Sequence, residues 1–154
     1  MNFGVSDSEK IIQRVRAILV TKRGTLMLIK RVKPGKAPYW VAPGGGVEEH
    51  DKSLSQTLER ELCEELGAVA EIVDIAFVMH HEIAGKNLEE HFYICKLLNY
   101  DLSMRNGPEF NDPTRGQYIP DEIPLTFDAI NNVEFKTPEI QQWLLAHLDI
   151  LRAL

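Results

Sequence analysis

The residues best suited to chemistry are the glutamates that crowd the end of one leucine-striped segment, LSQTLERELCEEL at 54–66. On an α-helix, Glu61 and Glu65 would lie about 40° apart, beside the stripe that the leucines form. Two carboxylates about 6 Å apart repel by roughly 3 kcal/mol at an effective dielectric near 20, and partial burial adds a desolvation penalty. Because the residue four positions after Glu61 is another glutamate rather than a lysine, a hard divalent cation such as Mg²⁺ is a fitting partner.

The segment before this helix indicates the same chemistry. Gly44, Gly45 and Gly46 are consecutive, so the backbone can approach a ligand closely, and the helix N-terminus that follows favours negative charge. Taken singly, a triple glycine is usually a plain turn, and an acidic helix is usually a solvated face. Their junction at this spacing instead favours metal-bridged phosphate chemistry.

The strands that must support these residues follow from local patterns. Residues 14–20 and 26–30 are β-rich runs separated by TKRGT, which predicts a hairpin, and 39–42 predicts a short strand. Residues 71–83 and 88–98 predict two long strands joined by AGKN, a second hairpin.

Helix signals stand between and after these strands. Ser53 with Gln56 forms a capping-box pattern and Gly67 is a natural stop, so a helix is expected over 54–66. The proline-rich stretch 99–125 has little periodicity and is interpreted as a long loop.

A final helix is expected near the end of the sequence. Thr137 is its predicted N-cap and Pro138 its first residue. Its apolar face would carry Ile140, Trp143, Leu144, Leu148 and Leu151. Strands with one helix near the middle and another at the end predict an α/β sandwich, a mixed sheet covered by helices.

Composition limits the partners of the protein. Its 154 residues suit one domain, and 17 basic against 23 acidic residues give a formal charge of −6, which opposes binding to nucleic acid or anionic lipid. The start lacks an apolar secretion signal and no stretch approaches the length of a membrane span, so a soluble, cytoplasmic protein is expected. Cys63 and Cys95 lack metal or redox spacing and are interpreted as inert thiols.

The segment PGGGVEEHDKSLSQTLERELCEELGA, at 43–68, resembles the signature of the Nudix hydrolases. The second half of that signature matches at Arg60, Glu61, Leu62, Glu64, Glu65, Gly67 and Ala68. The first half departs, because its expected glutamate falls on Asp51 when counted from the glycines and on Lys52 when counted back from the arginine. The loop therefore carries one additional residue, with Asp51 replacing glutamate.

The resemblance implies a fold and an activity. The fold would be the Nudix fold, an α/β/α sandwich with a mixed β-sheet, over a single domain of residues 1–154. The activity would be hydrolysis of a nucleoside diphosphate linked to a group X, giving a nucleoside monophosphate and phospho-X, with Mg²⁺ or Mn²⁺ as cofactor. Homodimers are common among such enzymes, although the sequence itself does not give the oligomeric state.

The resemblance also assigns roles. Glu61 and Glu65 would be metal ligands, Glu64 a further ligand directly or through water, and the Gly45 carbonyl a backbone ligand. Arg60 would orient the glutamates.

The general base and the substrate contacts are less constrained. The base would be Glu64 or Glu109, the latter from the 99–125 loop. Gly44 would approach the substrate, and Arg31 is the strongest candidate for a phosphate contact in a group of cations whose alternative is plain surface solvation. The other cations of that group are Lys30, Lys33 and Lys36.

Two other classes remain open. The domain could be a Nudix-fold module that binds a nucleotide without cutting it, or the acidic helix could be a structural or partner-binding face. The proline and tyrosine that mark ADP-ribose and dinucleoside polyphosphate hydrolases do not follow the motif at the usual distance. Nucleoside triphosphates, including oxidised ones, are therefore favoured over sugar nucleotides.

Overall fold

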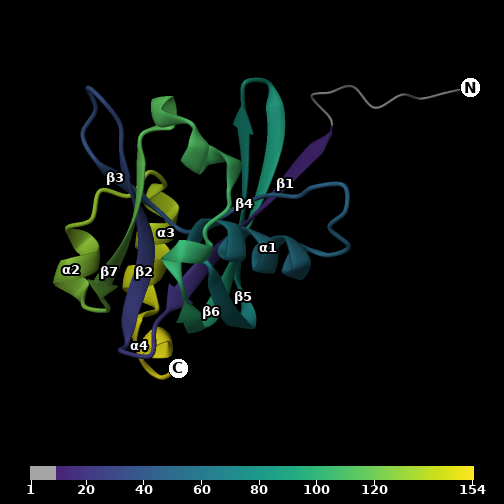
Figure 1. Cartoon of the computed structure of the whole chain (residues 1–154). Coiled ribbons are helices and arrows are strands. Elements are labelled where there is room, and N and C mark those ends of the chain that lie inside the picture. Colours follow the sequence, from purple (N-terminus) through teal and green to yellow (C-terminus); the bar gives the residue numbers. More distant parts are fainter. Residues whose placement is uncertain (1–9) are drawn as a thin grey trace, which may run out of the picture.

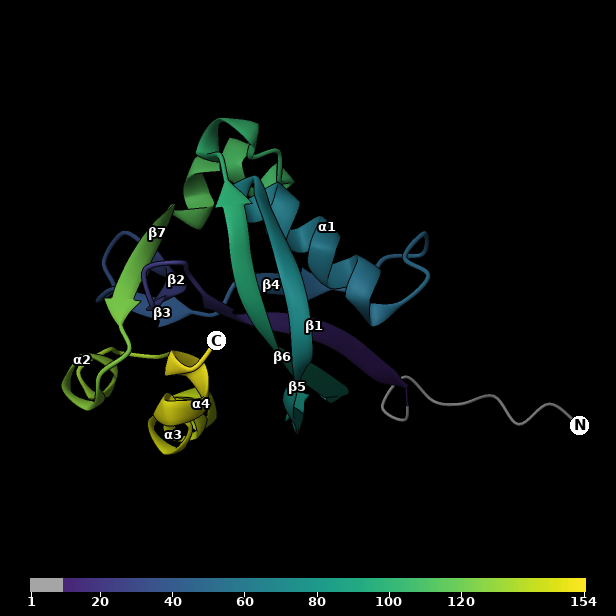
Figure 2. The ribbon, with the colours of Figure 1, turned by 90° about the horizontal axis from the view of Figure 1, so that it is seen from below.

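The computed structural model describes residues 10–154, so the first nine residues of the expected domain 1–154 lie outside the described part. Seven strands form one sheet, and helices cover both of its faces (Figure 1 and Figure 2). The strands are β1 (Ile11–Val20), β2 (Thr25–Val32), β3 (Tyr39–Val41), β4 (Gly44–Gly46), β5 (Ala68–Ile83), β6 (Lys86–Tyr100) and β7 (Gln117–Pro124). The helices are α1 (Leu54–Leu66), α2 (Phe127–Asn131), α3 (Pro138–Ala146) and α4 (Leu148–Arg152), with 3₁₀ turns η1 (Leu102–Met104), η2 (Pro108–Asn111) and η3 (Pro113–Arg115).

The sheet is built around β1. This strand runs parallel to β6 along its whole length and antiparallel to β2 and β4, and the remaining pairs are antiparallel, so the sheet is mixed. Its main order is β3-β2-β1-β6-β5, with β7 paired along the free side of β2. Both predicted hairpins, β1–β2 and β5–β6, are confirmed. Ala84 and Gly85 at the second turn both have positive φ (53° and 76°), as a two-residue hairpin turn requires.

Two apolar clusters lie on opposite faces of the sheet. On one face, Leu58, Leu62 and Leu66 of α1 are buried against alternate residues of β1, including Val15 and Leu19. On the other face, the intervening β1 residues pack with helices α2, α3 and α4; that cluster includes Ile18, Val20, Ile130, Ile140, Leu144, Leu148 and Leu151. The α/β/α sandwich is confirmed.

The interpretation of 99–125 as one long loop is wrong. Its first residues continue β6, its middle forms the three 3₁₀ turns, and 117–124 is strand β7, which pairs with β2 from Val32↔Gln117 to Thr25↔Pro124. Pro120 and Pro124 obscured this strand, because proline cannot donate to a ladder and is tolerated on an edge strand such as β7.

Two further predictions need correction. The triple glycine is a short strand rather than a turn, since β4 pairs with β1 at Arg14↔Gly46 and Arg16↔Gly44. The final helix begins at Pro138 as predicted but is interrupted at His147, so α3 and α4 are separate helices. No helix in residues 10–154 combines the length and hydropathy that crossing a membrane requires.

Candidate active site

Helix α1 is fixed at both ends by its own sequence. The Ser53 side chain accepts a hydrogen bond from the Gln56 N–H (3.1 Å), and Gly67 takes a left-handed conformation (φ 58°) that ends the helix. The Gln56 side-chain oxygen accepts from the Lys52 N–H (2.9 Å), one residue before the position that a capping box uses. The last two turns of α1 therefore hold their glutamates at a defined place beside β4.

These glutamates contact the glycines of β4. A Cβ added to Gly45 would lie 2.4 Å from the Glu61 carboxyl group, so the carboxylate occupies the space that a side chain would take. The Gly44 N–H donates to Glu65 Oε2 at 3.4 Å. Gly44 has φ 152°, and a Cβ there would lie 2.0 Å from the Val15 carbonyl oxygen, so a larger residue would have to displace backbone. The two glycines allow β4 to pass between β1 and the carboxylates.

Burial raises the pKa of both carboxyl groups. Burial raises the pKa of Glu65 to about 8, with the charge of Arg16 opposing this rise and that of Glu61 adding to it. Burial also raises the pKa of Glu61, although the nearby Arg60 opposes the change. A carboxyl that retains its proton because it is buried releases that proton when a cation binds. Glu65 is therefore suited to exchanging its proton for a divalent metal.

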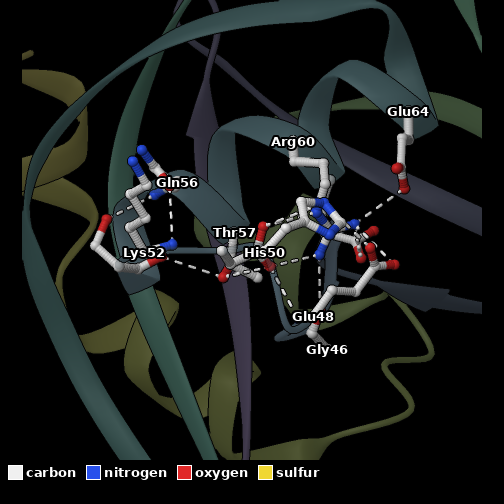
Figure 3. A network of polar contacts seen from close by, with 11 residues as sticks. Gly46, Glu48, His50, Lys52, Gln56, Thr57, Arg60 and Glu64 are labelled. Carbon is white, nitrogen blue, oxygen red and sulfur yellow. Dashed lines mark hydrogen bonds and ion pairs between the residues drawn. The ribbon is translucent and has the colours of Figure 1, made fainter.

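Arg60 lies at the centre of a polar network between α1 and the glycine-rich segment (Figure 3). Its Nη1 donates to Glu61 and to Glu64, both at 3.2 Å, and its Nη2 donates to the Gly46 carbonyl oxygen at 2.9 Å. The pKa of Arg60 is raised, first by its hydrogen bonds to Asp51. The guanidinium thus restrains two of the three glutamates.

A cavity of about 270 Å³ joins α1, β4 and the segment before β7. Six residues singled out from the sequence line it: Arg31, Gly44, Gly45, Glu61, Glu65 and Glu109. Arg60 and Glu64 are outside this lining, and Glu64 instead contacts Arg60. The same cavity is lined by cations and tyrosines: Arg14, Arg16, Arg115, Lys136, Tyr39 and Tyr118. Acidic and basic side chains therefore share one cavity.

Glu61 and Glu65 fit a magnesium-type ion with help from other ligands. Within residues 10–154, no three acidic, histidine or cysteine side chains converge closely enough to hold a metal ion alone. Mg²⁺ in phosphate-processing sites is typically bound by one or two carboxylates, with water and substrate phosphates completing its octahedron. The donor set of this cavity matches that pattern.

The family model for the NUDIX domain matches residues 11–141 of this chain. The chain belongs to the Nudix family. It is a Nudix hydrolase, of a family that acts on pyrophosphate bonds. A sequence comparison with curated proteins gave no significant match.

Solved structures show the same fold. A NUDIX hydrolase from Nitrosomonas europaea has TM-score 0.69 and 18% identity, with 88% of this chain and 86% of that chain covered. The Ap4A hydrolase of C. elegans has TM-score 0.66 and 19% identity (93% and 99% covered), and the E. coli ORF135 protein has TM-score 0.65 and 24% identity (97% and 96% covered). At these sequence identities, the matches show that this Nudix hydrolase shares the fold of the three structures.

The irregular position of the Nudix motif is occupied by Asp51. Its side chain is buried and bonds to Arg60, whereas Lys52 is exposed and contributes its backbone N–H to Gln56. Asp51 therefore provides the acidic contact to the arginine, with a side chain one methylene shorter than that of the expected glutamate.

The two predicted residues from outside the motif also reach the cavity. Glu109 lies in η2, and its charge contributes to the raised pKa values of Glu61 and Glu65. The Arg31 guanidinium lies 3.6 Å from the centre of the Tyr118 ring and donates to the backbone carbonyl oxygen of Gln117 (3.3 Å). Both residues are therefore near the α1 glutamates, although they come from distant segments.

Arg16 was not predicted from the sequence as a site residue. Its Nε donates to the buried Glu90 carboxylate (3.0 Å) and its Nη1 to the Ala42 carbonyl oxygen (3.1 Å), so its charge is fixed near Glu65. The available signal was the pair Arg14 and Arg16, two apart in an otherwise apolar strand and hence on one face. No comparable pattern marks the other residues that were missed, Arg115, Tyr118 and Lys136.

Proposed function

We propose that this Nudix hydrolase cleaves a nucleoside diphosphate linked to a group X, using Mg²⁺ or Mn²⁺, and releases a nucleoside monophosphate and phospho-X. The observation that carries the proposal is the shared cavity, in which the partly buried Glu61 and Glu65 carboxyls lie with Arg16 and Arg31. A site for neutral ligands would not need both signs of charge in one small enclosure.

Glu61 and Glu65 are the proposed metal ligands, with Glu64 contributing through water or after release from Arg60. When bound, the divalent cation supplies charge neutralisation of the diphosphate and a lowered pKa for the attacking water.

In the antiparallel β1–β4 ladder, hydrogen-bonded residue pairs recur at every second residue. The first such pair is Ala17 with Pro43, since the Ala17 N–H donates to the Pro43 carbonyl oxygen (2.8 Å).

That alternation has a consequence for the backbone ligand. Val15 and Gly45 form the next bonded pair, so the Gly45 carbonyl faces β1. The Gly44 N–H faces Glu65. We therefore propose Gly44, in place of the expected Gly45, as the source of a backbone carbonyl for the metal.

Water would be deprotonated by Glu109 rather than by Glu64. Glu109 lines the cavity, whereas the Glu64 carboxylate is 3.2 Å from Arg60 and outside the lining. Arg16 and Arg31 would bind the phosphate oxygens, because guanidinium groups match phosphate geometry and stay charged. Arg60 would act as a positioning residue for Glu61.

The alternative is a nucleotide sensor that binds without hydrolysis, which the departure from the motif at Asp51 favours. Asp51 nonetheless keeps Arg60 in place, so that irregularity leaves the carboxylate set intact. The test is release of nucleoside monophosphate from a mixed panel of nucleoside triphosphates and nucleotide sugars, with Mg²⁺, with Mn²⁺ and with chelator. Metal-dependent release supports the hydrolase, and tight nucleotide binding without release under either metal would establish the sensor.

A further inference from the structure

A second cavity, of about 620 Å³, adjoins the candidate active site. Four cations, Arg31, Lys33, Lys36 and Arg115, belong to its lining, and no acidic residue does. Arg31, Arg115 and Tyr118 also line the cavity that contains the glutamates. The two spaces therefore meet at these side chains, and we name the second one the basic pocket.

The basic pocket lies between two segments that are far apart in the sequence. One is the turn after β2, and the other is the run of 3₁₀ turns before β7; both project at the same end of the molecule in Figure 1. Arg31 connects them, since its guanidinium donates to the backbone carbonyl oxygens of Arg115 and Gln117. At Gly116 a Cβ would lie 2.2 Å from the Val32 carbonyl oxygen, so the segments are in close contact. These contacts hold together the two segments that line the basic pocket.

The local field favours an anion. Burial would raise the pKa of Tyr39, yet the pKa is lowered because Lys33 donates a hydrogen bond to it and because Arg31, Lys33 and Lys136 are close. One acidic group, Asp112, lies 3.5 Å from Arg115, and its side chain is 43% exposed. A chain with a net charge of −6 therefore gathers positive charge at one side of its acidic site.

We propose that the basic pocket binds phosphate groups carried by X, so that the substrate class is a nucleoside diphosphate whose X is phosphate or a phosphate chain rather than a neutral sugar. This inference rests on the proposed function and specifies its substrate. A diphosphate at Glu61 and Glu65 places its X toward Arg31 and Arg115, and each further phosphate gains a charge-assisted contact with Lys33 or Lys36. A neutral X would gain none of these contacts.

The experiment compares substrates that differ in X alone. Adenosine 5′-tetraphosphate, ATP and ADP-glucose form one series, and the corresponding guanosine compounds with GDP-mannose form the other. The variant is Lys33→Gln with Lys36→Gln. Its matched control is Lys22→Gln with Lys86→Gln, which removes the same charge from two exposed positions outside the pocket, one in the β1–β2 turn and one at the start of β6.

The wild-type enzyme is expected to give the highest kcat/KM with the tetraphosphates. The pocket variant should raise KM for tetraphosphates by about tenfold while leaving the sugar nucleotides unchanged, since exposed charge contacts are individually weak. The effect should shrink at high ionic strength because salt screens it. The control variant should match the wild type.

Two outcomes would overturn the inference. Equal turnover of sugar nucleotides and tetraphosphates, with no selective effect of the pocket variant, would remove the basic pocket from substrate choice and leave the proposed function standing. If no substrate turns over, the proposed function fails, and calorimetric titration with inorganic tripolyphosphate in chelator decides the pocket separately. Weaker binding by the pocket variant than by its control supports the inference, and equal or absent binding refutes it.

Discussion

Asp51 and Arg60 form a two-bond ion pair that joins the glycine-rich segment to α1. Arg60 Nε donates to Asp51 Oδ1 at 3.1 Å, and Nη2 donates to Oδ2 at 2.9 Å. The Asp51 side chain is 3% exposed and also accepts from the Glu48 N–H and the Thr57 hydroxyl, both at 2.9 Å. Hydrogen bonding to Arg60 is the main reason that the pKa of Asp51 lies far below its ordinary value. The irregular residue of the motif thus fixes the arginine that restrains Glu61.

The substitution Asp51→Asn should lower kcat/KM by about ten- to a hundredfold, because Arg60, which positions Glu61, loses its ion pair with the Asp51 carboxylate. Steady-state kinetics with the best substrate of the nucleotide panel measures this. Glu49→Gln, an exposed neighbour in the same loop, is the control. A D51N enzyme with normal kinetics would show that Arg60 needs no such support.

The same pair should affect stability in acid. The pKa of Asp51 is lower in the folded protein than its ordinary value of 3.8. The contribution of Asp51 to the free energy of unfolding is therefore present above pH 3.8 and is lost as the pH falls through the folded-state pKa. The gap in urea midpoint between wild type and D51N should therefore narrow between neutral pH and about pH 2. A gap that does not change over this range would contradict the assignment.

Glu65 should make the metal-free protein less stable as pH rises. The pKa of Glu65 is about 8 in the folded protein and 4.5 ordinarily. The contribution of Glu65 to the free energy of unfolding is therefore fully present below pH 4.5 and is lost as the pH rises through the folded-state pKa. Thermal unfolding in chelator should show a falling midpoint from about pH 5 to about pH 8, and Mg²⁺ should restore stability at the upper end. Glu65→Gln should flatten this dependence, and an unchanged slope in that variant would assign the effect elsewhere.

Glu61→Gln and Glu65→Gln should each reduce metal-dependent turnover by at least about a hundredfold, because each removes a charged oxygen ligand. Circular dichroism should show an intact fold. Glu59→Gln changes an exposed glutamate of the same helix and should retain activity. Wild-type rates in either site variant would exclude that residue from the metal site.

Gly45→Ala should affect catalysis more than folding. The new Cβ would fall 2.4 Å from the flexible end of Glu61, which must move, and small displacements in a site can reduce rates by about a hundredfold. Gly46→Ala places its Cβ where no atom lies within 4 Å, which makes it the matched control. Similar rates in the two variants would mean that the Gly45–Glu61 contact has no catalytic role.

Glu109→Gln should lower kcat more than Glu64→Gln, since Glu109 lines the cavity and Glu64 is bonded to Arg60. Mg²⁺ affinity separates the roles: loss of a base should leave it nearly unchanged, whereas loss of a ligand should weaken it. The reverse ranking would make Glu64 the general base.

Local sequence patterns were sufficient for α1 and its glutamates. The spacing of four residues between leucines, with Ser53 and Gly67 at the ends, predicted the helix that the structure contains. The fixed angle per residue then placed Glu61 and Glu65 beside the buried stripe. Helix geometry depends on neighbours in the chain, so these features did not require knowledge of the fold.

Patterns failed where pairing partners are distant. Strand β7 has little alternation of its own, and its position follows from eight consecutive pairs with β2. The cations that line the cavity come from β1, from β2, from η3 and from Lys136 just before α3, so no local sequence pattern links these four segments.

The sequence by itself determined the family motif, the acidic helix and the two hairpins. The tertiary structure alone decided that Arg16, Arg31 and Arg115 share a cavity with Glu61 and Glu65. The physical reason is range: helix and strand periodicity act over a few residues, whereas the charges around this site are assembled by sheet order and by packing between segments that are far apart in the chain, such as β1 and η3.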